Sequence, residues 1–108
     1  MEIKSTLNGD EVLVKVIGRV DTTNYNEFEK SVNEILDKQT KHLILDCSEL
    51  NYISSSGLRV FLTIQKYMMS TGGKFSLFAM QQGIKEIFDI SGFSSIFSIY
   101  TDLESARS

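Results

Sequence analysis

Three features that this 108-residue sequence lacks limit what the protein can be. It has one cysteine, Cys47, so no disulfide can form within the chain, and a lone cysteine agrees with a reducing compartment. It has no basic run, and 11 Lys and Arg against 14 Asp and Glu give a net charge of −3, so a nucleic acid is not an expected partner. Its uncharged stretches are too short for a membrane helix, and its first residues do not resemble a signal peptide. Together these absences predict a cytoplasmic protein without membrane insertion.

The rest of the composition is that of an ordinary globular domain. Hydrophobic residues make up 42% of the chain and charged residues 23%. A chain of this length buries enough apolar surface to fold without a metal ion or a disulfide. We therefore expect one domain over residues 1–108, with no internal repeat and no linker, and we expect no cofactor and no metal site.

Alternating strand and helix patterns predict the fold class. Asn8-Gly9 between two β-rich runs is a strong hairpin signal, because both residues accept the positive φ that a type I′ turn requires. After this hairpin, apolar residues at helical spacing alternate with short β-compatible runs. The fold class is therefore predicted as α/β, a single domain with a mixed, largely parallel sheet opened by a hairpin and with helices packed against it. The expected strands are residues 2–7, 11–17, 43–45, 74–79 and 95–100. The expected helices are residues 25–36, a second helix that begins within residues 54–57 and is stopped by residues 71–73, and residues 81–90 and 101–106.

Some residues predict where these elements begin and end. Residues 11–17 carry apolar side chains on both faces, which places this strand inside the sheet, and Gly18 is expected to end it. Asn24 and Glu27 have the spacing of a capping box at the start of the first helix. Residues 37–41 are expected to form a short charged connection.

The most informative stretch is residues 43–69, which we interpret as strand, loop and helix. The boundary before the helix is Ser54-Ser55-Ser56-Gly57. Serine is favoured at a helix N-cap because its hydroxyl accepts a first-turn amide hydrogen, so one serine is expected to cap the helix and the others to lie beside it. In α/β sheets, ligands and partners bind where the carboxyl ends of strands meet the amino ends of helices, and a helix amino end tolerates a phosphate. From spacing alone, however, a cap with two polar neighbours is the preferred interpretation, and the glycine is expected where the chain passes close to the sheet or to a partner.

The stretch DCSELNYISSSGL, residues 46–58, closely resembles the central motif of the STAS family, the sulfate-transporter and anti-sigma-factor-antagonist domain. In that family an apolar strand ends in Asp-x-Ser and leads to a phosphorylatable serine that opens a helix. The resemblance extends to GRVD at residues 18–21 and to GGK at residues 72–74, so it spans nearly the whole chain. This likeness to a bacterial family makes a phosphorylation switch at these serines the preferred interpretation, ahead of a helix cap with two polar neighbours.

The resemblance implies a regulatory protein without catalytic residues. The family's modified residue lies two positions before the glycine, which is Ser55 here, and Ser54 and Ser56 are the alternatives because Ser54 stands where many members have an acidic residue. It implies that an anti-sigma factor with serine kinase activity binds the unmodified chain and leaves when the serine is phosphorylated, and that a serine phosphatase reverses the modification, which regulates transcription. The implied partner-binding residues are Asp21, Ser54, Ser55, Ser56, Gly57 and Arg59.

Two other functions remain open. A small enzyme would pair a serine nucleophile with His42, the one histidine, as general base, although a lone histidine beside an apolar strand is more often structural. A scaffold or a subunit of a sensory assembly would have the same fold without phosphorylation.

Three other reactive side chains are interpreted as structural. Cys47 has acidic rather than basic neighbours, which disfavours a reactive thiolate, so it is expected to be half-buried and inert. Asp21 and Asp46 are expected to accept hydrogen bonds from backbone amides rather than to chelate magnesium.

Overall fold

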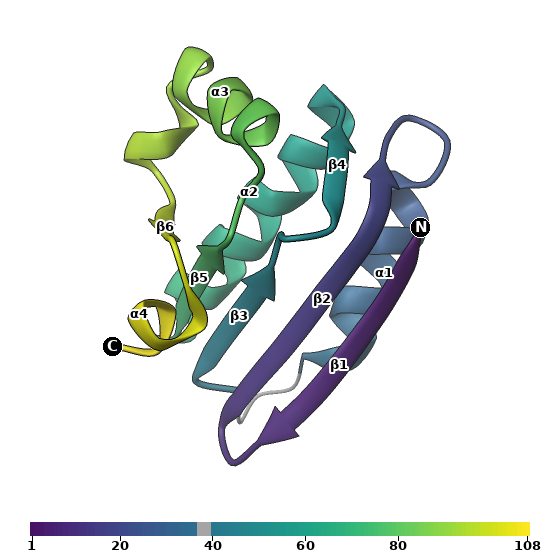
Figure 1. Cartoon of the computed structure of the whole chain (residues 1–108). Helices are drawn as coiled ribbons and strands as arrows, with labels where there is room; N and C mark the ends of the chain where they lie inside the picture. The colour runs from purple at the N-terminus through teal and green to yellow at the C-terminus, as the bar shows by residue number, and fades with distance from the viewer. Residues whose placement is uncertain (37–39) are drawn as a thin grey trace.

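One mixed sheet forms the frame of the molecule (Figure 1). The computed structural model describes residues 1–36 and 40–108, and within these residues the sheet has six strands. β1 and β2 pair antiparallel and every other pairing is parallel, with the order β1-β2-β3-β5-β6 and with β4 also beside β2. The predicted fold class is confirmed. The strands are β1 (Glu2–Asn8), β2 (Glu11–Val20), β3 (His42–Asp46), β4 (Leu50–Ile53), β5 (Lys74–Phe78) and β6 (Ser98–Tyr100).

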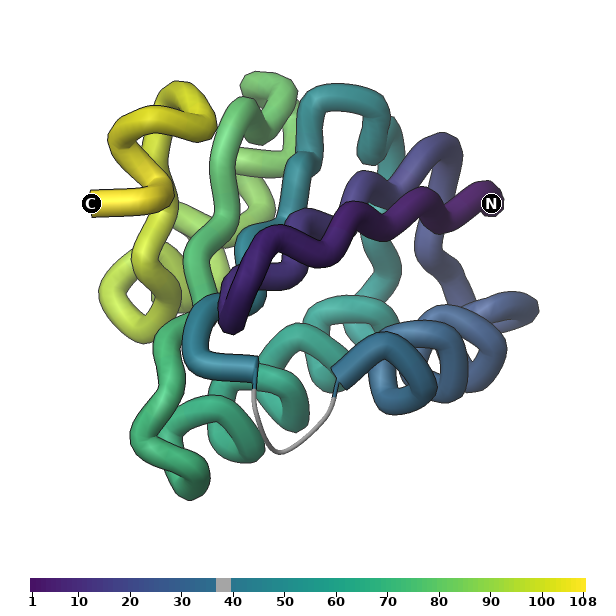
Figure 2. The backbone as a smooth tube through the Cα atoms, turned by 90° about the horizontal axis from the view of Figure 1, so that it is seen from below, coloured from purple at the N-terminus to yellow at the C-terminus, as the bar shows by residue number. Residues whose placement is uncertain are grey.

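The helices cover the two faces of the sheet unequally. α1 and α2 lie along one face, and the short α4 lies on the other (Figure 2). Even the longest helix in the described residues, the 16-residue α2, lacks the length and apolar character needed to cross a membrane. The helices are α1 (Tyr25–Ile35), α2 (Ser55–Ser70), α3 (Gln82–Ile90) and α4 (Leu103–Arg107), with a 3-10 turn at Phe93–Ser95.

β2 is apolar on both faces because it lies inside the sheet, as predicted. Val12, Val14 and Val16 are buried on the side of α1 and α2, whereas Leu13 packs in the smaller core beneath α4. Because successive side chains of a strand point to opposite faces of the sheet, β2 contributes side chains to both cores.

A cluster of phenylalanines joins the helices to the sheet. Phe61 of α2 is fully buried, and its ring lies 5.7 Å from Phe28 of α1, 6.4 Å from Phe75 of β5 and 6.0 Å from Phe88 of α3, measured between centroids. Phe97 adds a further edge contact at 6.4 Å. Such pairs add about 0.5–1.5 kcal/mol each beyond the burial of their area. α2 is thus fixed through one ring to four other segments.

The prediction that Gly18 ends the second strand is wrong. β2 continues to Val20, and Gly18, with a φ of 102°, marks the point where β2 changes partner from β3 to β4. The Gly18 amide donates to the carbonyl of Glu49 at 2.9 Å, which holds the start of β4 there. β4 is absent from the predicted strands, because its four residues follow the pattern buried, exposed, exposed, buried and so lack a period of two.

The predicted capping box of Asn24 and Glu27 is also wrong. Asn24 stands at the N-cap of α1, but its side chain makes no capping hydrogen bond. Its side-chain oxygen instead accepts from the backbone amide of Asp21 at 2.9 Å, which closes the turn that precedes the helix. The charged connection expected at residues 37–41 falls partly on residues 37–39, which lie outside the described residues.

The phenylalanine cluster generates the first prediction. Phe61→Ala should lower the free energy of unfolding by about 3–5 kcal/mol, because it leaves a cavity where four rings meet. Ile90→Ala, at a side chain that is 88% exposed, should change it by less than about 0.5 kcal/mol. Urea unfolding followed by circular dichroism measures both, and similar losses for the two variants would show that the rings do not form the centre of the core.

Candidate functional site

The candidate site lies where β2 and β4 end. Their last residues, Val20 and Ile53, are paired in register, and the Val20 carbonyl accepts a hydrogen bond from the Ser54 amide at 2.9 Å. Residues 21–24 leave β2 at this point and α2 leaves β4 (Figure 1). The structure therefore gathers the loop before α1 and the first turn of α2 at one edge of the sheet, where ligands and partners of such sheets bind.

Ser54 caps α2. Its backbone is extended, its hydroxyl oxygen accepts from the Gly57 amide at 3.2 Å, and its carbonyl accepts from the Leu58 amide at 2.9 Å. This is the geometry of a serine N-cap, which stabilises a helix by about 1 kcal/mol. The hydroxyl of Ser54 is therefore engaged in holding the helix start.

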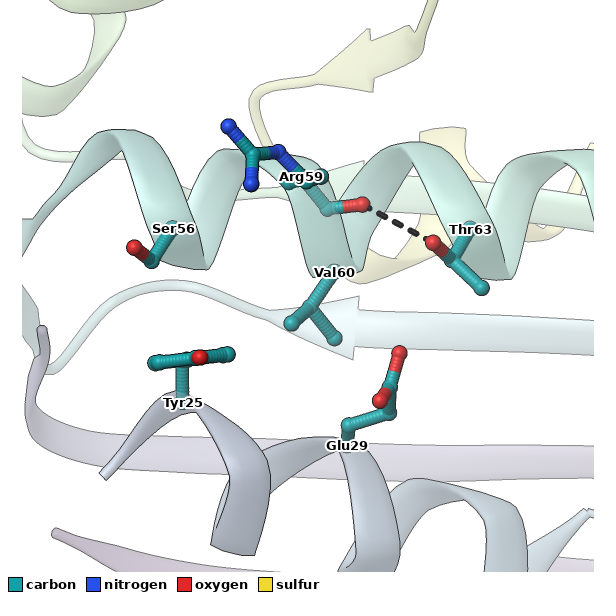
Figure 3. Close-up of a pocket in the computed structure, with 6 residues that line it drawn as sticks. All are labelled: Tyr25, Glu29, Ser56, Arg59, Val60 and Thr63. Atoms are coloured by element: carbon teal, nitrogen blue, oxygen red, sulfur yellow. Dashed lines mark hydrogen bonds between the residues drawn. The ribbon is translucent and has the colours of Figure 1, made fainter. Parts of the chain in front are cut away.

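Ser55 and Ser56 have different surroundings from Ser54 and from each other. Ser55 is the first residue of α2 and is exposed, and its hydroxyl makes no hydrogen bond within the described part of the chain. Ser56 is partly buried and lines a pocket between α1 and α2 (Figure 3). The pocket is lined by Tyr25, Glu29, Ser56, Arg59, Val60 and Thr63.

Gly57 brings the first turn of α2 close to the sheet. A Cβ built on this residue would lie 2.8 Å from Cγ1 of Ile53 and 2.9 Å from Cγ1 of Val20, which is closer than side chains tolerate. The absence of a side chain at this position sets how near the helix lies to the ends of β2 and β4.

Asp21 is held rigidly beside this turn. One carboxylate oxygen accepts from the amide of Thr23 at 2.9 Å and from its hydroxyl at 2.5 Å, and the other accepts from Nε of Arg19 at 2.8 Å. The two bonds from Thr23, and after them Arg19, lower the pKa of Asp21. Arg19 also stacks over the ring of Tyr52 at 4.8 Å from its centroid. The acid is thus kept ionised, and the predicted bond to a backbone amide is confirmed.

Arg59 lies one turn into α2 and is exposed. It also lines the pocket between α1 and α2, and Figure 3 shows its guanidinium displaced toward the amino end of the helix. The ion pairs recorded among the described residues do not include Arg59.

His42 is not brought to the serine triplet. It begins β3 at the opposite edge of the sheet, and its Nε2 lies 2.9 Å from the hydroxyl of Ser76, a fully buried residue. Burial, and secondarily the charge of Lys74, lowers the pKa of His42. The serine that this histidine contacts is therefore inaccessible to a substrate, and the geometry does not support a serine hydrolase.

Cys47 and Asp46 have structural positions. Cys47 is fully buried, rather than half-buried as predicted, and burial raises the pKa of its thiol strongly. Asp46 accepts a hydrogen bond from the backbone amide of Ser48 at 2.9 Å, as predicted.

Sequence reasoning missed the pocket beside Ser56 and the stacking of Arg19 on Tyr52. Ser56, Val60 and Thr63 recur at intervals of four and three, which predicts that they share one face of a helix. No sequence signal shows that Tyr25 and Glu29 of α1 face them, because that depends on how the helices pack.

The chain is similar in sequence to one protein family and to known members of it. The model of the family described as STAS domain matches residues 2–106. The protein BtrV of Bordetella bronchiseptica, named as a candidate anti-sigma factor antagonist, is 36% identical over 89 residues, which are 82% of this chain and 77% of that protein.

Two solved structures have similar folds. The crystal structure of a candidate anti-sigma factor antagonist from Thermotoga maritima has a TM-score of 0.89 and 22% identity, and the match covers 98% of this chain and 95% of that one. The Bacillus cell fate determinant SpoIIAA in its phosphorylated form has a TM-score of 0.73 and 16% identity, with 96% of each chain covered.

The contact at Gly57 generates the second prediction. Gly57→Ala should destabilise the protein by about 1–3 kcal/mol, because its methyl group must displace Ile53 or Val20. Gly83→Ala in α3 is the matched control, since a Cβ there meets nothing within 4 Å and should stabilise the helix by up to about 1 kcal/mol. Thermal and urea unfolding measure both changes. A Gly57→Ala protein at least as stable as the wild type would show that the site does not depend on this approach.

The bonds to Asp21 generate the third prediction, a pH-dependent one. The pKa of Asp21 is lower in the folded protein than in the unfolded chain, so its stabilising effect is complete above about pH 4 and is lost as pH falls through the folded pKa. Asp21→Asn should therefore be less stable than the wild type at pH 7, and the difference should close in acid. Urea unfolding between pH 7 and pH 2 measures it.

Thr23→Val removes the hydroxyl donor to Asp21 and provides the control. In that background the pH-dependent loss of stability caused by Asp21→Asn should shrink. A loss that stays constant down to pH 2 would mean that the carboxylate charge at residue 21 does not contribute to stability.

Proposed function

The chain belongs to the STAS domain family, and on that premise we propose that it is a cytoplasmic anti-sigma factor antagonist that acts by binding rather than by catalysis. In this proposal the whole chain, residues 1–108, is one STAS domain. It binds an anti-sigma factor with serine kinase activity while Ser55 is unmodified, and phosphorylation of Ser55 releases that partner. A serine phosphatase restores the binding state.

The observation that carries the proposal is the exposed hydroxyl of Ser55. Of the three serines, Ser54 uses its hydroxyl to cap α2 and Ser56 lines the pocket against α1, whereas Ser55 is exposed on the first turn. A kinase reaches Ser55 without breaking the cap. Its oxygen attacks the γ-phosphorus of ATP, the bond to ADP breaks, and the hydroxyl proton passes to a base of the kinase. The phosphorylated form of SpoIIAA, a protein of similar fold, also supports this choice of chemistry.

The fold tolerates the new charge but the complex does not. An anion at a helix amino end is favoured by about 0.3–1 kcal/mol, so phosphorylation leaves the domain folded. Phosphate brings about −1.5 to −2 charges and three acceptor oxygens onto a surface that fitted a small hydroxyl. In this proposal the surface that contacts the partner also includes Asp21, Gly57 and Arg59. The phosphate on Ser55 makes this surface less complementary to the partner.

The fourth prediction concerns the charge at residue 55. Ser55→Asp should weaken binding to the purified kinase at least about tenfold, because an unmatched charge in an interface costs more than about 1.4 kcal/mol. Ser55→Ala should bind within about threefold of the wild type, because it removes only an exposed hydroxyl. Isothermal titration calorimetry measures the affinities, and thermal melts of the free variants establish that each is folded.

Thr63→Asp is the matched control, since it adds the same charge to an exposed position of α2 two turns further on. It should bind more tightly than Ser55→Asp. Equal affinities of Ser55→Asp and the wild type, with both proteins folded, would contradict the assignment of the switch to Ser55.

A further inference from the structure

We propose that Arg59 is the intramolecular partner of the phosphate on Ser55, so that phosphorylation adds an anion and also removes a free cation from the partner-binding surface. This inference rests on the proposed function, because it describes how the modification of Ser55 acts. It adds to charge repulsion a second effect that lies entirely within this chain.

The spacing along α2 places the two side chains together. Ser55 is the first residue of the helix and Arg59 is four residues further on, so both lie on one face with their Cβ atoms about 5–6 Å apart. Side chains of a helix point toward its amino end, so the side chain of Arg59 extends over the turn that holds Ser55. Figure 3 shows the guanidinium displaced in that direction.

Arg59 is available for such a pair. It is exposed, and the ion pairs found within residues 1–36 and 40–108 leave it without a carboxylate. Glu29 lines the same pocket, but the ion pairs of the described residues do not join it to Arg59. The other cation at this edge, Arg19, is already bonded to Asp21 at 2.8 Å.

The chemistry of the two groups suits each other. A guanidinium offers two parallel N–H donors that match two phosphate oxygens, and the resulting bonds are charge-assisted. A phosphoserine oxygen reaches further from the helix than a hydroxyl does, which shortens the span to a side chain one turn away. Once paired, Arg59 no longer presents free donors to an incoming protein.

The experiment installs phosphoserine at position 55 during translation, so that no kinase is needed. Phosphorus NMR then follows the second ionisation of this phosphate with pH in the otherwise wild-type chain and in Arg59→Gln. Loss of the cation should raise the phosphate pKa by roughly 0.15–0.4 unit, the equivalent of one i,i+4 ion pair. Arg59→Lys should fall between the two, because it keeps the charge and loses the paired donors.

Lys66→Gln is the matched control, since Lys66 is an exposed cation on the same helix, three turns from Ser55. It should leave the phosphate pKa unchanged. Asp21, Arg19 and Glu29, the other charged groups around this turn, are the same in all variants. A phosphate pKa in Arg59→Gln equal to that of the wild type, or a Lys66→Gln shift as large, would overturn the pairing.

This test and the test of the proposed function fail separately. If the kinase does not use Ser55, the calorimetric series changes but the titration of the installed phosphate does not. If Arg59 does not pair with the phosphate, the titration shows no shift while Ser55→Asp still weakens binding.

Discussion

The approach of α2 to the sheet at Gly57 positions the serines at the start of the helix beside the ends of β2 and β4. A Cβ at this residue would collide with Ile53 and Val20, so the helix lies where it does only because residue 57 has none. In the first turn Ser54 caps the helix with its hydroxyl, whereas Ser55, the first helical residue, is exposed. Arg59 follows Ser55 one turn later on the same helix. The position of the serines therefore depends on one close contact between helix and sheet.

The contact at Gly57 depends on the change of the strand that pairs with β2, from β3 to β4. Its first half pairs with β3 and its last residues pair with β4, and Gly18 at the junction adopts a φ of 102° that few other residues accept. As a result Val20 and Ile53 end side by side, and the loop after β2 meets the start of α2. The bonds among Arg19, Asp21 and Thr23 fix that loop, so the two halves of the proposed binding surface are rigid before a partner arrives.

Sequence reasoning predicted the features that depend on local patterns. The opening hairpin, the interior position of β2 and the amphipathic helices follow from turn residues and periodicity, and the structure confirms them. The predicted type I′ turn at Asn8-Gly9 is wrong, because Asn8 pairs with Glu11, the turn consists of Gly9 and Asp10, and only Gly9 of these residues has a positive φ. Sequence reasoning did not predict β4, because the burial of its four residues does not alternate. It also predicted a capping box from the spacing of Asn24, whose side chain instead bonds to the turn before the helix. The motif placed the candidate serines correctly at a helix start, but three adjacent serines are chemically identical in a sequence. Only the cap geometry distinguishes the engaged hydroxyl of Ser54 from the exposed one of Ser55.

That distinction is the central claim, and mapping the modified residue tests it most directly. The wild-type protein is incubated with its kinase and ATP, and fragmentation mass spectrometry then locates the phosphate within the serine triplet. The structure predicts one phosphate, on Ser55, because Ser54 would have to release the first turn of α2 and Ser56 lies against α1. A phosphate on Ser54 or Ser56, or none at all in a mixture that contains the active kinase, would contradict it.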